Sequence, residues 1–333
     1  MEARYYEQLI GEKVQCKLCP HNCIIAQDKS GICKVRSNIG GSLYSDMYGF
    51  LAATHFDPIE KKPLYHYYPG TEILSLGALG CNFHCTCCQN YEISQTGKAG
   101  FPRLQELSVQ DIIKLSTLRP GNLGVAYTYN EPFVWYEFMY DIAQKIKMNQ
   151  GRNVVVSNGY VNKEPLHAIL PFIDAFNIDI KAFDNEVYRK FAGGELNAVL
   201  ENLEIIAQAG KHLEITLLIV PGVNDVFSQF KKLVEWIAHN LGKNVPLHLS
   251  RYFPHYKLKT ESTSLQVIDE FADYAQKHLS FVYTGNIARS EYMNTFCPDC
   301  GSLIIQREGY YTRLLAIDER GNCSECGRNI AVL

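Results

Sequence analysis

The chain has 333 residues, 47% of them hydrophobic and 20% charged, and its formal net charge is −3. This composition is ordinary for a globular enzyme with one large α/β domain and added modules, or with two domains, and it has no basic excess to suggest nucleic acid as a partner. The longest apolar runs, such as 215–220, are too short to span a membrane, and the first residues lack the basic start and apolar core of a signal peptide, so we expect a cytoplasmic protein.

Strand and helix patterns alternate along the middle of the chain. The helix expected over 132–151 begins with proline and stops at glycine, as helix capping favours. The predicted strands cover 71–80, 122–130, 152–160, 175–183, 212–222, 244–253 and 279–287. The predicted helices cover 108–119, 132–151, 162–172 (with a break at Pro171), 196–210, 226–240 and 264–278.

Six strand–helix units and a closing strand predict a parallel sheet covered by helices. We therefore expect an α/β fold, a partial (β/α)6 TIM-like barrel over 71–288, between cysteine-rich modules over 1–70 and 289–333. The active site of such a barrel lies at the carboxyl ends of its strands.

The twelve cysteines fall in three groups, and none lies between residues 89 and 296. In a reducing cytoplasm, clustered thiols are more often metal ligands or redox groups than disulfides. The groups are Cys16, Cys19, Cys23 and Cys33; Cys81, Cys85, Cys87 and Cys88; and Cys297, Cys300, Cys323 and Cys326.

In the middle group, Cys81, Cys85 and Cys88 have the spacing C-x3-C-x2-C directly after the first predicted strand. Thiolates are the usual ligands of iron–sulfur clusters, and three of them leave one iron of a four-iron cubane open to a small molecule. An open coordination position is typical of catalytic rather than structural metal centres. A chance cluster or a zinc knuckle is the alternative, and the place of the motif at a strand end disfavours it.

This motif resembles that of the radical S-adenosylmethionine (SAM) enzymes. The resemblance implies a [4Fe–4S] cluster on Cys81, Cys85 and Cys88, SAM chelated to the open iron, and an electron donor such as flavodoxin or ferredoxin. It further implies reductive cleavage of SAM to a 5′-deoxyadenosyl radical that abstracts hydrogen from a substrate. Cys87 stands where relatives usually have an aromatic residue, and we expect it to line the adenine side as a small buried side chain.

The same resemblance assigns the ends of the next two strands to SAM. Glu131 matches the acidic position of a GGEP-like turn that receives the amino group, and Asn130 offers a carbonyl oxygen, although Tyr129 and Asn130 replace the usual glycines. A simple helix-start turn is the alternative for this stretch. Ser157 and Asn158 are candidates for contacts with the ribose.

The fourth strand ends in DIK, which resembles the DLK of the activating enzymes of glycyl-radical enzymes. Asp179 and Lys181 point to one side of the strand, and the lysine is a candidate partner for the carboxylate of SAM or for a substrate anion. A strand-end salt bridge is the alternative. The stretch 218–225 resembles the VVPG turn of those activating enzymes, and His255, near the end of the sixth strand, is a weaker candidate for cofactor binding.

Cys297, Cys300, Cys323 and Cys326 form C-x2-C-x22-C-x2-C, with a glycine after each pair that permits a tight turn. Four thiolates suit zinc first, a rubredoxin-like iron second, and an auxiliary cluster as a further alternative. Cys16, Cys19, Cys23 and Cys33 form C-x2-C-x3-C-x9-C, which suits either zinc or an auxiliary iron–sulfur cluster, and His21 is close enough in sequence to replace a thiolate.

Over essentially its whole length the chain resembles the radical SAM member of the AmmeMemoRadiSam system, related to pyruvate formate-lyase activating enzymes. The segments that carry this resemblance are CKLCPHNC, GICKVR, DPIEKKPLYHYYPG, LGCNFHC, CQNYEISQ, YTYNEP and the terminal CPDCG and CSECG. The resemblance implies AMMECR-like and Memo-like partner proteins but no substrate. The acid and lysines of DPIEKKPL form a solvated loop by default, and in the family context they line the mouth of the active site.

Three functions remain open at this point. The first is a radical SAM enzyme that acts on a peptide, a protein or a small metabolite. The second is activation of a glycyl-radical enzyme, whose target is a backbone glycine. The third is a non-catalytic iron–sulfur or zinc scaffold, which would not need Glu131, Asp179 and Lys181 at the strand ends.

Overall fold

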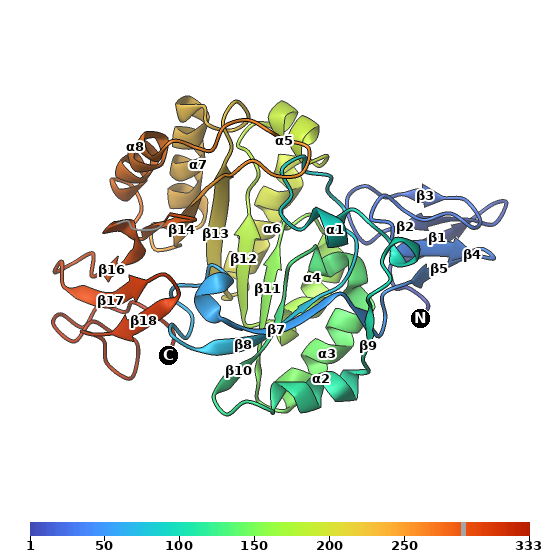
Figure 1. Ribbon diagram of the computed structural model, residues 1–333, viewed down its shortest axis with the longest axis horizontal. Coiled ribbons are helices and arrows are strands. Elements are labelled where there is room, and N and C mark those ends of the chain that lie inside the picture. The colour runs from blue at the N-terminus through green and yellow to red at the C-terminus, as the bar shows by residue number, and fades with distance from the viewer. Residues whose placement is uncertain (288–290) are drawn as a thin grey trace.

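The computed structural model describes residues 1–287 and 291–333, so the expected boundary at 288/289 lies outside the described residues. Its centre is an eight-stranded sheet in the order β15-β14-β13-β12-β11-β10-β8-β7 (Figure 1). All neighbouring strands pair in parallel except the edge pair β7 and β8, which is antiparallel. The strands are β7 (Ala53–Pro58), β8 (Glu72–Gly77), β10 (Asn122–Tyr127), β11 (Arg152–Ser157), β12 (Ala175–Asp179), β13 (His212–Ile219), β14 (Leu247–Arg251) and β15 (Val282–Gly285).

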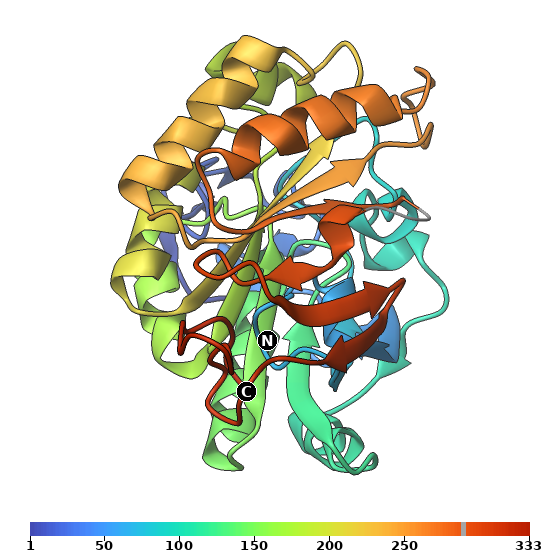
Figure 2. The same ribbon diagram turned by 90° about the vertical axis from the view of Figure 1, so that its left-hand side faces the viewer.

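Helices follow the parallel strands and cover one face of the sheet (Figure 1, Figure 2). They are α2 (Val109–Ser116), α3 (Tyr136–Met148), α4 (Lys163–Ile169), α6 (Leu196–Gln208), α7 (Phe227–Asn240) and α8 (Leu265–Gln276). The predicted α/β class and alternation are therefore confirmed. A 3-10 turn (η3, Pro132–Trp135) precedes α3, and another (η4, Leu170–Phe172) follows α4 and contains Pro171, where the break was expected.

Two short helices of the described residues were not predicted, α1 (Tyr91–Ser94) and α5 (Asn185–Phe191). Helix α5 begins where the Asp184 side chain accepts from two backbone N–H groups, at Glu186 and Val187. This side-chain cap offsets the small length of the helix. The parallel strands are buried on both faces, as the sequence AFNID of β12 illustrates, so their patterns are continuous rather than alternating.

The segment after β7 crosses the inner face of the sheet, and we call residues 59–68 the floor segment. It begins with a 3-10 turn (η1, Ile59–Lys61). The Asn177 side chain of β12 donates to the carbonyl of Pro63 at 2.8 Å, and the buried carboxylate of Glu214 accepts from the N–H groups of Tyr65 and His66. The floor segment thus packs on the inner face of the sheet, although it directly follows the edge strand β7.

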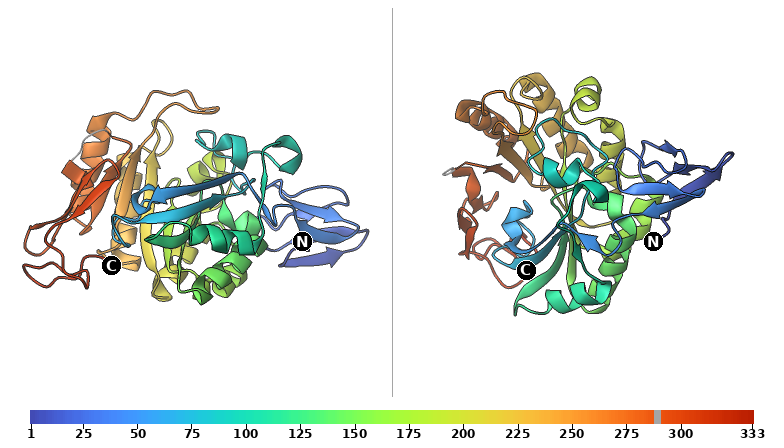
Figure 3. Two further views of the ribbon diagram at one scale, coloured as in Figure 1. Left: turned by 60° about the horizontal axis from the view of Figure 1, so that its bottom comes forward. Right: turned by 45° about the vertical axis from the view of Figure 1, so that its right-hand side comes forward.

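The two ends of the chain form small sheets on opposite sides of the central one (Figure 1, Figure 3). The N-terminal strands are β1 (Tyr6–Leu9), β2 (Lys13–Cys16), β3 (Ile24–Ile25), β4 (Arg36–Ile39) and β5 (Ser42–Ser45). The C-terminal strands are β16 (Thr295–Phe296), β17 (Leu303–Glu308) and β18 (Tyr311–Leu314). No helix of the described residues is both long enough and apolar enough to cross a membrane.

Candidate active site

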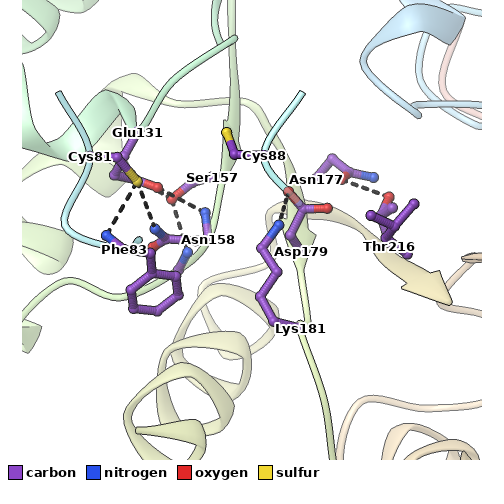
Figure 4. Close-up of polar contacts among 12 residues, drawn as sticks. Cys81, Phe83, Cys88, Glu131, Ser157, Asn158, Asn177, Asp179, Lys181 and Thr216 are labelled. Carbon is purple, nitrogen blue, oxygen red and sulfur yellow. Dashed lines mark hydrogen bonds and ion pairs between the residues drawn. The ribbon is translucent and has the colours of Figure 1, made fainter. Parts of the chain in front are cut away.

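A cavity of about 370 Å³ opens at the carboxyl ends of the parallel strands. The loop that follows β8 contributes the thiols of Cys81, Cys85 and Cys88 to its wall. The Sγ atom of Cys81 accepts from the N–H of Phe83 at 3.3 Å and from the Asn158 side chain at 3.8 Å (Figure 4). The Sγ atom of Cys88 lies 3.2 Å from the hydroxyl of Ser94. The sequence motif therefore folds as one thiol-lined wall.

These thiols are partly buried, and their sulfur atoms do not converge on one point. Burial raises the pKa of Cys85 to about 12 and that of Cys81 well above its ordinary value. In the described part of the chain, the one group of three or more ligand atoms within 4.8 Å of one another is in the C-terminal module. A single tetrahedral ion needs closely convergent thiolates. Three separated thiols on one loop instead fit a polynuclear iron–sulfur cluster.

Glu131 holds together the ends of two strands beside the thiols. Its carboxylate accepts from the Ser157 hydroxyl at 2.8 Å, from the Asn158 N–H at 2.9 Å and from the Phe133 N–H at 3.1 Å. The turn is therefore a helix start, as the alternative reading held, and it also lines the cavity. Burial raises the pKa of Glu131 to about 7, although the three donors oppose that shift.

Asn130 connects the end of β10 with the cysteine loop. Its side chain donates to the carbonyls of Leu79 and Gly80, at 3.0 and 2.8 Å, and accepts from the N–H of Ala78 at 3.2 Å. Because all three partners belong to the loop that leads to Cys81, Asn130 positions the first thiol. Its side-chain oxygen is already engaged, so any contact with a ligand would use its backbone.

Asp179 and Lys181 line the same cavity and form an ion pair, with Lys181 Nζ 2.9 Å from Asp179 Oδ2 (Figure 4). The predicted salt bridge is thus present, and both side chains still face the cavity. Burial by itself lowers the pKa of Lys181, but the charges of Asp179 and Cys85 outweigh burial and raise it. Lys181 is therefore a cation within reach of the thiol wall.

The comparisons with known proteins agree with this geometry. The family model of the Radical SAM superfamily matches residues 77–237. An uncharacterized protein of Methanocaldococcus jannaschii is 40% identical over 335 residues, which cover 100% of this chain and 99% of that protein. The chain belongs to the radical SAM superfamily.

Several activating enzymes are similar to this chain at lower identity. The 4-hydroxyphenylacetate decarboxylase activating enzyme of Clostridium scatologenes is 26% identical over 35% of this chain and 38% of its own length. The trans-4-hydroxy-L-proline dehydratase activating enzyme of Clostridioides difficile is 28% identical over 49% of this chain and 58% of its own length. The chain thus matches only part of these enzymes.

Solved structures support the radical SAM fold. The crystal structure of Streptococcus suis SuiB bound to the precursor peptide SuiA has a TM-score of 0.51, with 14% identity over 68% of this chain and 51% of that one. A radical SAM methyltransferase from Sphaerobacter thermophilus has a TM-score of 0.50, with 14% identity over 71% of each chain. At these identities the likeness concerns the fold alone.

Cys87 and His255 are the remaining predicted cofactor-binding residues, and they differ in their position relative to the cavity. Cys87 lines the cavity and packs in a buried apolar cluster with Phe191, Val220 and Tyr252. His255, by contrast, is absent from the cavity lining of the described residues, and it pairs with Leu258 and contacts the ring of Tyr91. The structure therefore brings together every predicted cofactor-binding residue except His255.

The lysines of DPIEKKPL were placed at the mouth of the cavity by the family resemblance, but they were not named as site residues. Lys61 and Lys62 of the floor segment line the cavity, and both pair with Asp57, at 2.9 and 2.7 Å. The Tyr129 hydroxyl donates to the same carboxylate. Burial lowers the pKa of Lys62 to about 8, although Asp57 opposes the shift. The run DPIEKKPL contained the signal, but nothing in the sequence showed that this loop turns inward.

Asn224 is another residue whose role the sequence did not reveal. Its side chain donates to the carbonyls of Lys181 and Leu218 and accepts from the N–H of Val220 at 2.6 Å. It therefore ties the turn after β13 to the cation of the cavity. The stretch VPGVND indicated a turn, and only the fold shows what Asn224 positions.

The four C-terminal thiols converge. The ligand atoms of Cys297, Cys300, Cys323 and Cys326 all lie within 4.8 Å of one another. This spacing fits a single tetrahedral ion. The module packs its buried residues against Phe281 and Tyr283, at the edge strand β15, and against Tyr65 of the floor segment.

Proposed function

We propose that this radical SAM protein is an enzyme that cleaves S-adenosylmethionine and uses the resulting 5′-deoxyadenosyl radical to abstract hydrogen from a substrate. One observation carries the proposal: the thiols of Cys81, Cys85 and Cys88 and the polar ends of three strands line one cavity. A [4Fe–4S] cluster on these thiolates would supply the single electron that the cleavage requires.

The residues of the chain have separate roles in this proposal. Glu131, as a carboxylate, receives the amino group of SAM, and Lys181 balances its carboxylate. Ser157 and Asn158 hold the Glu131 carboxylate in place, and Asn158 also donates toward Cys81. Cys87 contributes apolar surface on the adenine side. The buried walls exclude water from a reactive radical.

The substrate occupies the part of the cavity that faces the floor segment. Lys61 and Lys62 share the single carboxylate of Asp57, so this wall carries a net positive charge. It therefore favours a substrate with a carboxylate or another anionic group, on a peptide, a protein or a small metabolite. An electron donor such as flavodoxin or ferredoxin and the AMMECR-like and Memo-like partners remain part of the proposal.

Activation of a glycyl-radical enzyme is the second candidate. The matches to activating enzymes that act on 4-hydroxyphenylacetate decarboxylase and trans-4-hydroxy-L-proline dehydratase favour it. This function would place a backbone glycine of a partner protein in the cavity. A non-catalytic scaffold is disfavoured, because it does not explain why Glu131, Asp179 and Lys181 line the same cavity as the thiols.

The test is production of 5′-deoxyadenosine by anaerobically reconstituted protein with SAM and dithionite. We expect the wild type to form it and the variant with C81A, C85A and C88A to form none. Cys87→Ala is the matched control, because it removes a neighbouring thiol outside the proposed ligand set, and it should retain the iron and acid-labile sulfide of the cluster. Loss of iron and sulfide in Cys87→Ala with full content in Cys88→Ala would overturn the ligand assignment.

A further inference from the structure

The N-terminal cysteine group lies directly behind the catalytic loop. Cys16, Cys19, Cys23 and Cys33 line one small cavity, with about 20 Å³ of free space between their side chains, and Asn82 forms part of the same wall. Asn82 follows Cys81 in the chain, and its carbonyl lies 2.8 Å from His21 Nε2. Asn82 therefore connects the loop of Cys81 with the wall of the N-terminal cavity.

The close approach continues along the backbone. Gly80, directly before Cys81, lies so near the N-terminal module that a Cβ atom there would be 2.4 Å from the carbonyl oxygen of Cys33. At Gly97 a Cβ atom would be 2.5 Å from the carbonyl oxygen of Lys34, whose side chain donates to Gln95 at 2.6 Å. The N-terminal module is thus built against the catalytic loop rather than attached by a linker.

The spacing of the thiols separates this site from a zinc site. In the described residues, the C-terminal thiols converge within 4.8 Å, whereas the N-terminal thiols form no such group, and neither do Cys81, Cys85 and Cys88. A single metal ion requires ligand atoms that converge on one point. Four separated thiolates around a cavity with mostly apolar walls instead have the arrangement that suits a polynuclear cluster.

A buried cation completes the site. Arg36 is 1% exposed and lines the cavity, and its two terminal nitrogens bind Glu137, yet its Nε has no hydrogen-bond partner. An unpaired buried donor is costly. Its positive charge is close enough to Cys16 and Cys33 to interact with their thiolates. A sulfur-rich group in the cavity would give this Nε–H an acceptor.

We propose that Cys16, Cys19, Cys23 and Cys33 hold a second [4Fe–4S] cluster that exchanges single electrons with the cluster on Cys81, Cys85 and Cys88. The electron gained by one cluster is lost by the other, and the original reductant is a low-potential one-electron carrier. The inference rests on the proposed function, because the second cluster serves the first. His21 positions the wall between them through its contact with Asn82.

The first experiment counts iron, acid-labile sulfide and zinc in full-length protein reconstituted without oxygen. The variant with C81A, C85A and C88A leaves the N-terminal site intact. We expect it to keep about four irons and four sulfides per chain, against about eight of each in cluster sites of the wild type. The reduced variant should give the electron paramagnetic resonance signal of an iron–sulfur cluster under dithionite. Addition of SAM should change the signal of the wild type and leave that of the variant unchanged.

Adding Cys19→Ser and Cys23→Ser to that variant should remove the remaining sulfide. Metal without sulfide in the first variant, or sulfide that persists in the second, overturns the inference. In the wild type, proximity predicts spin coupling between the two reduced clusters, which the variants lack. Two uncoupled signals would contradict the exchange of electrons between neighbouring sites.

The outcomes also separate this inference from the proposed function. If the wild type forms no 5′-deoxyadenosine while the first variant retains sulfide, the proposed function fails and the N-terminal cluster stands. If the wild type forms 5′-deoxyadenosine but the first variant holds no sulfide, the radical chemistry stands and the second cluster is overturned.

Discussion

At the scale of single residues, Glu131 is a group of the cavity whose charge changes near neutral pH. Burial raises its pKa to about 7, so the carboxylate loses its negative charge as the pH falls through that value. A carboxylate attracts an ammonium group, and a neutral carboxylic acid does not. The role proposed for Glu131 therefore becomes measurable as a pH dependence of SAM binding.

We expect SAM to bind the reconstituted protein about tenfold more weakly at pH 6 than at pH 8, because at pH 6 only about a tenth of Glu131 would be ionised. Equilibrium dialysis under anaerobic conditions measures the Kd. Glu131→Gln should bind weakly and lose the part of the pH dependence that belongs to Glu131. If the Kd of SAM depended on pH in the same way in wild type and variant, Glu131 would not contact the ammonium group of SAM.

Gly80 tests the contact between the catalytic loop and the N-terminal module. Its φ of +84° favours glycine, and a Cβ atom would meet the Cys33 carbonyl oxygen at 2.4 Å and Val35 Cγ2 at 2.7 Å. We expect Gly80→Ala to lower the free energy of unfolding by about 2–4 kcal/mol, from backbone strain and overpacking together. Urea denaturation measures this change.

Gly242→Ala is the matched control for Gly80→Ala. Gly242 also has a positive φ, +98°, but nothing lies within 4 Å of its Cβ position. It should therefore show backbone strain alone, about 1–2 kcal/mol. An equal decrease in the free energy of unfolding in the two variants would mean that the N-terminal module shifts away from the new Cβ atom at Gly80. The close contact would then contribute nothing measurable to stability.

At the scale of secondary-structure elements, a buried ion pair fastens β4 to α3. Arg36 at the start of β4 binds Glu137 of α3 with both terminal nitrogens, at 2.9 and 3.0 Å, and the N–H of Arg4 donates to the same carboxylate at 2.7 Å. Both side chains are almost fully buried, at 2% and 1% exposure. Removal of one partner leaves the other as an uncompensated buried charge.

We therefore expect Glu137→Ala to destabilise the protein by about 3–5 kcal/mol. Thermal unfolding followed by circular dichroism should show a clear fall in Tm. The comparison variant is Glu186→Ala, which breaks the exposed pair with Lys190 at 2.6 Å and should leave Tm unchanged. A small effect in Glu137→Ala would mean that solvent reaches Arg36 once the carboxylate is gone.

Regular elements were predictable where local pattern and tertiary role agree. Each predicted strand and helix between 71 and 287 has a counterpart in the structure, because continuous apolar runs and capped amphipathic runs depend on neighbouring residues. The edge strand β7 was missed, since ATHFDP is partly exposed and shows no clear alternation. Short β strands of the modules carry even less local signal.

At the scale of the whole molecule, the cysteine-lined side of the cavity was predictable from the residues alone, and the side that Lys61 and Lys62 form was not. Cysteine spacing and strand ends are local in sequence, so they indicated the residues on one side of the cavity. Lys62 reaches the cavity only because the floor segment crosses the sheet and pairs Pro63 with Asn177, 114 residues away. His255 shows the converse, because a position near a strand end did not bring it into the cavity.

Contacts of the C-terminal module connect its metal site with the floor segment. Arg307 of β17 donates to the carbonyl of Tyr65 at 2.7 Å, and Tyr65 packs in the same buried cluster as Cys297 and Cys323. Metal binding contributes to folding free energy in small modules that lack an adequate core of their own. We expect removal of the ion, proposed as zinc, to loosen the module and the floor segment together.

A chelator should therefore lower Tm and increase amide hydrogen exchange in the C-terminal strands and in residues 59–68, while the sulfide content of the middle site is unchanged. Cys323→Ser should reproduce this pattern without chelator, because it removes a buried ligand of the convergent set. The variant with C81A, C85A and C88A should respond to the chelator as the wild type does, since its C-terminal thiols are intact. If exchange increased in the C-terminal strands alone, the contact through Arg307 and Tyr65 would not transmit the loss, and the floor would depend on its bonds to Asn177 and Glu214.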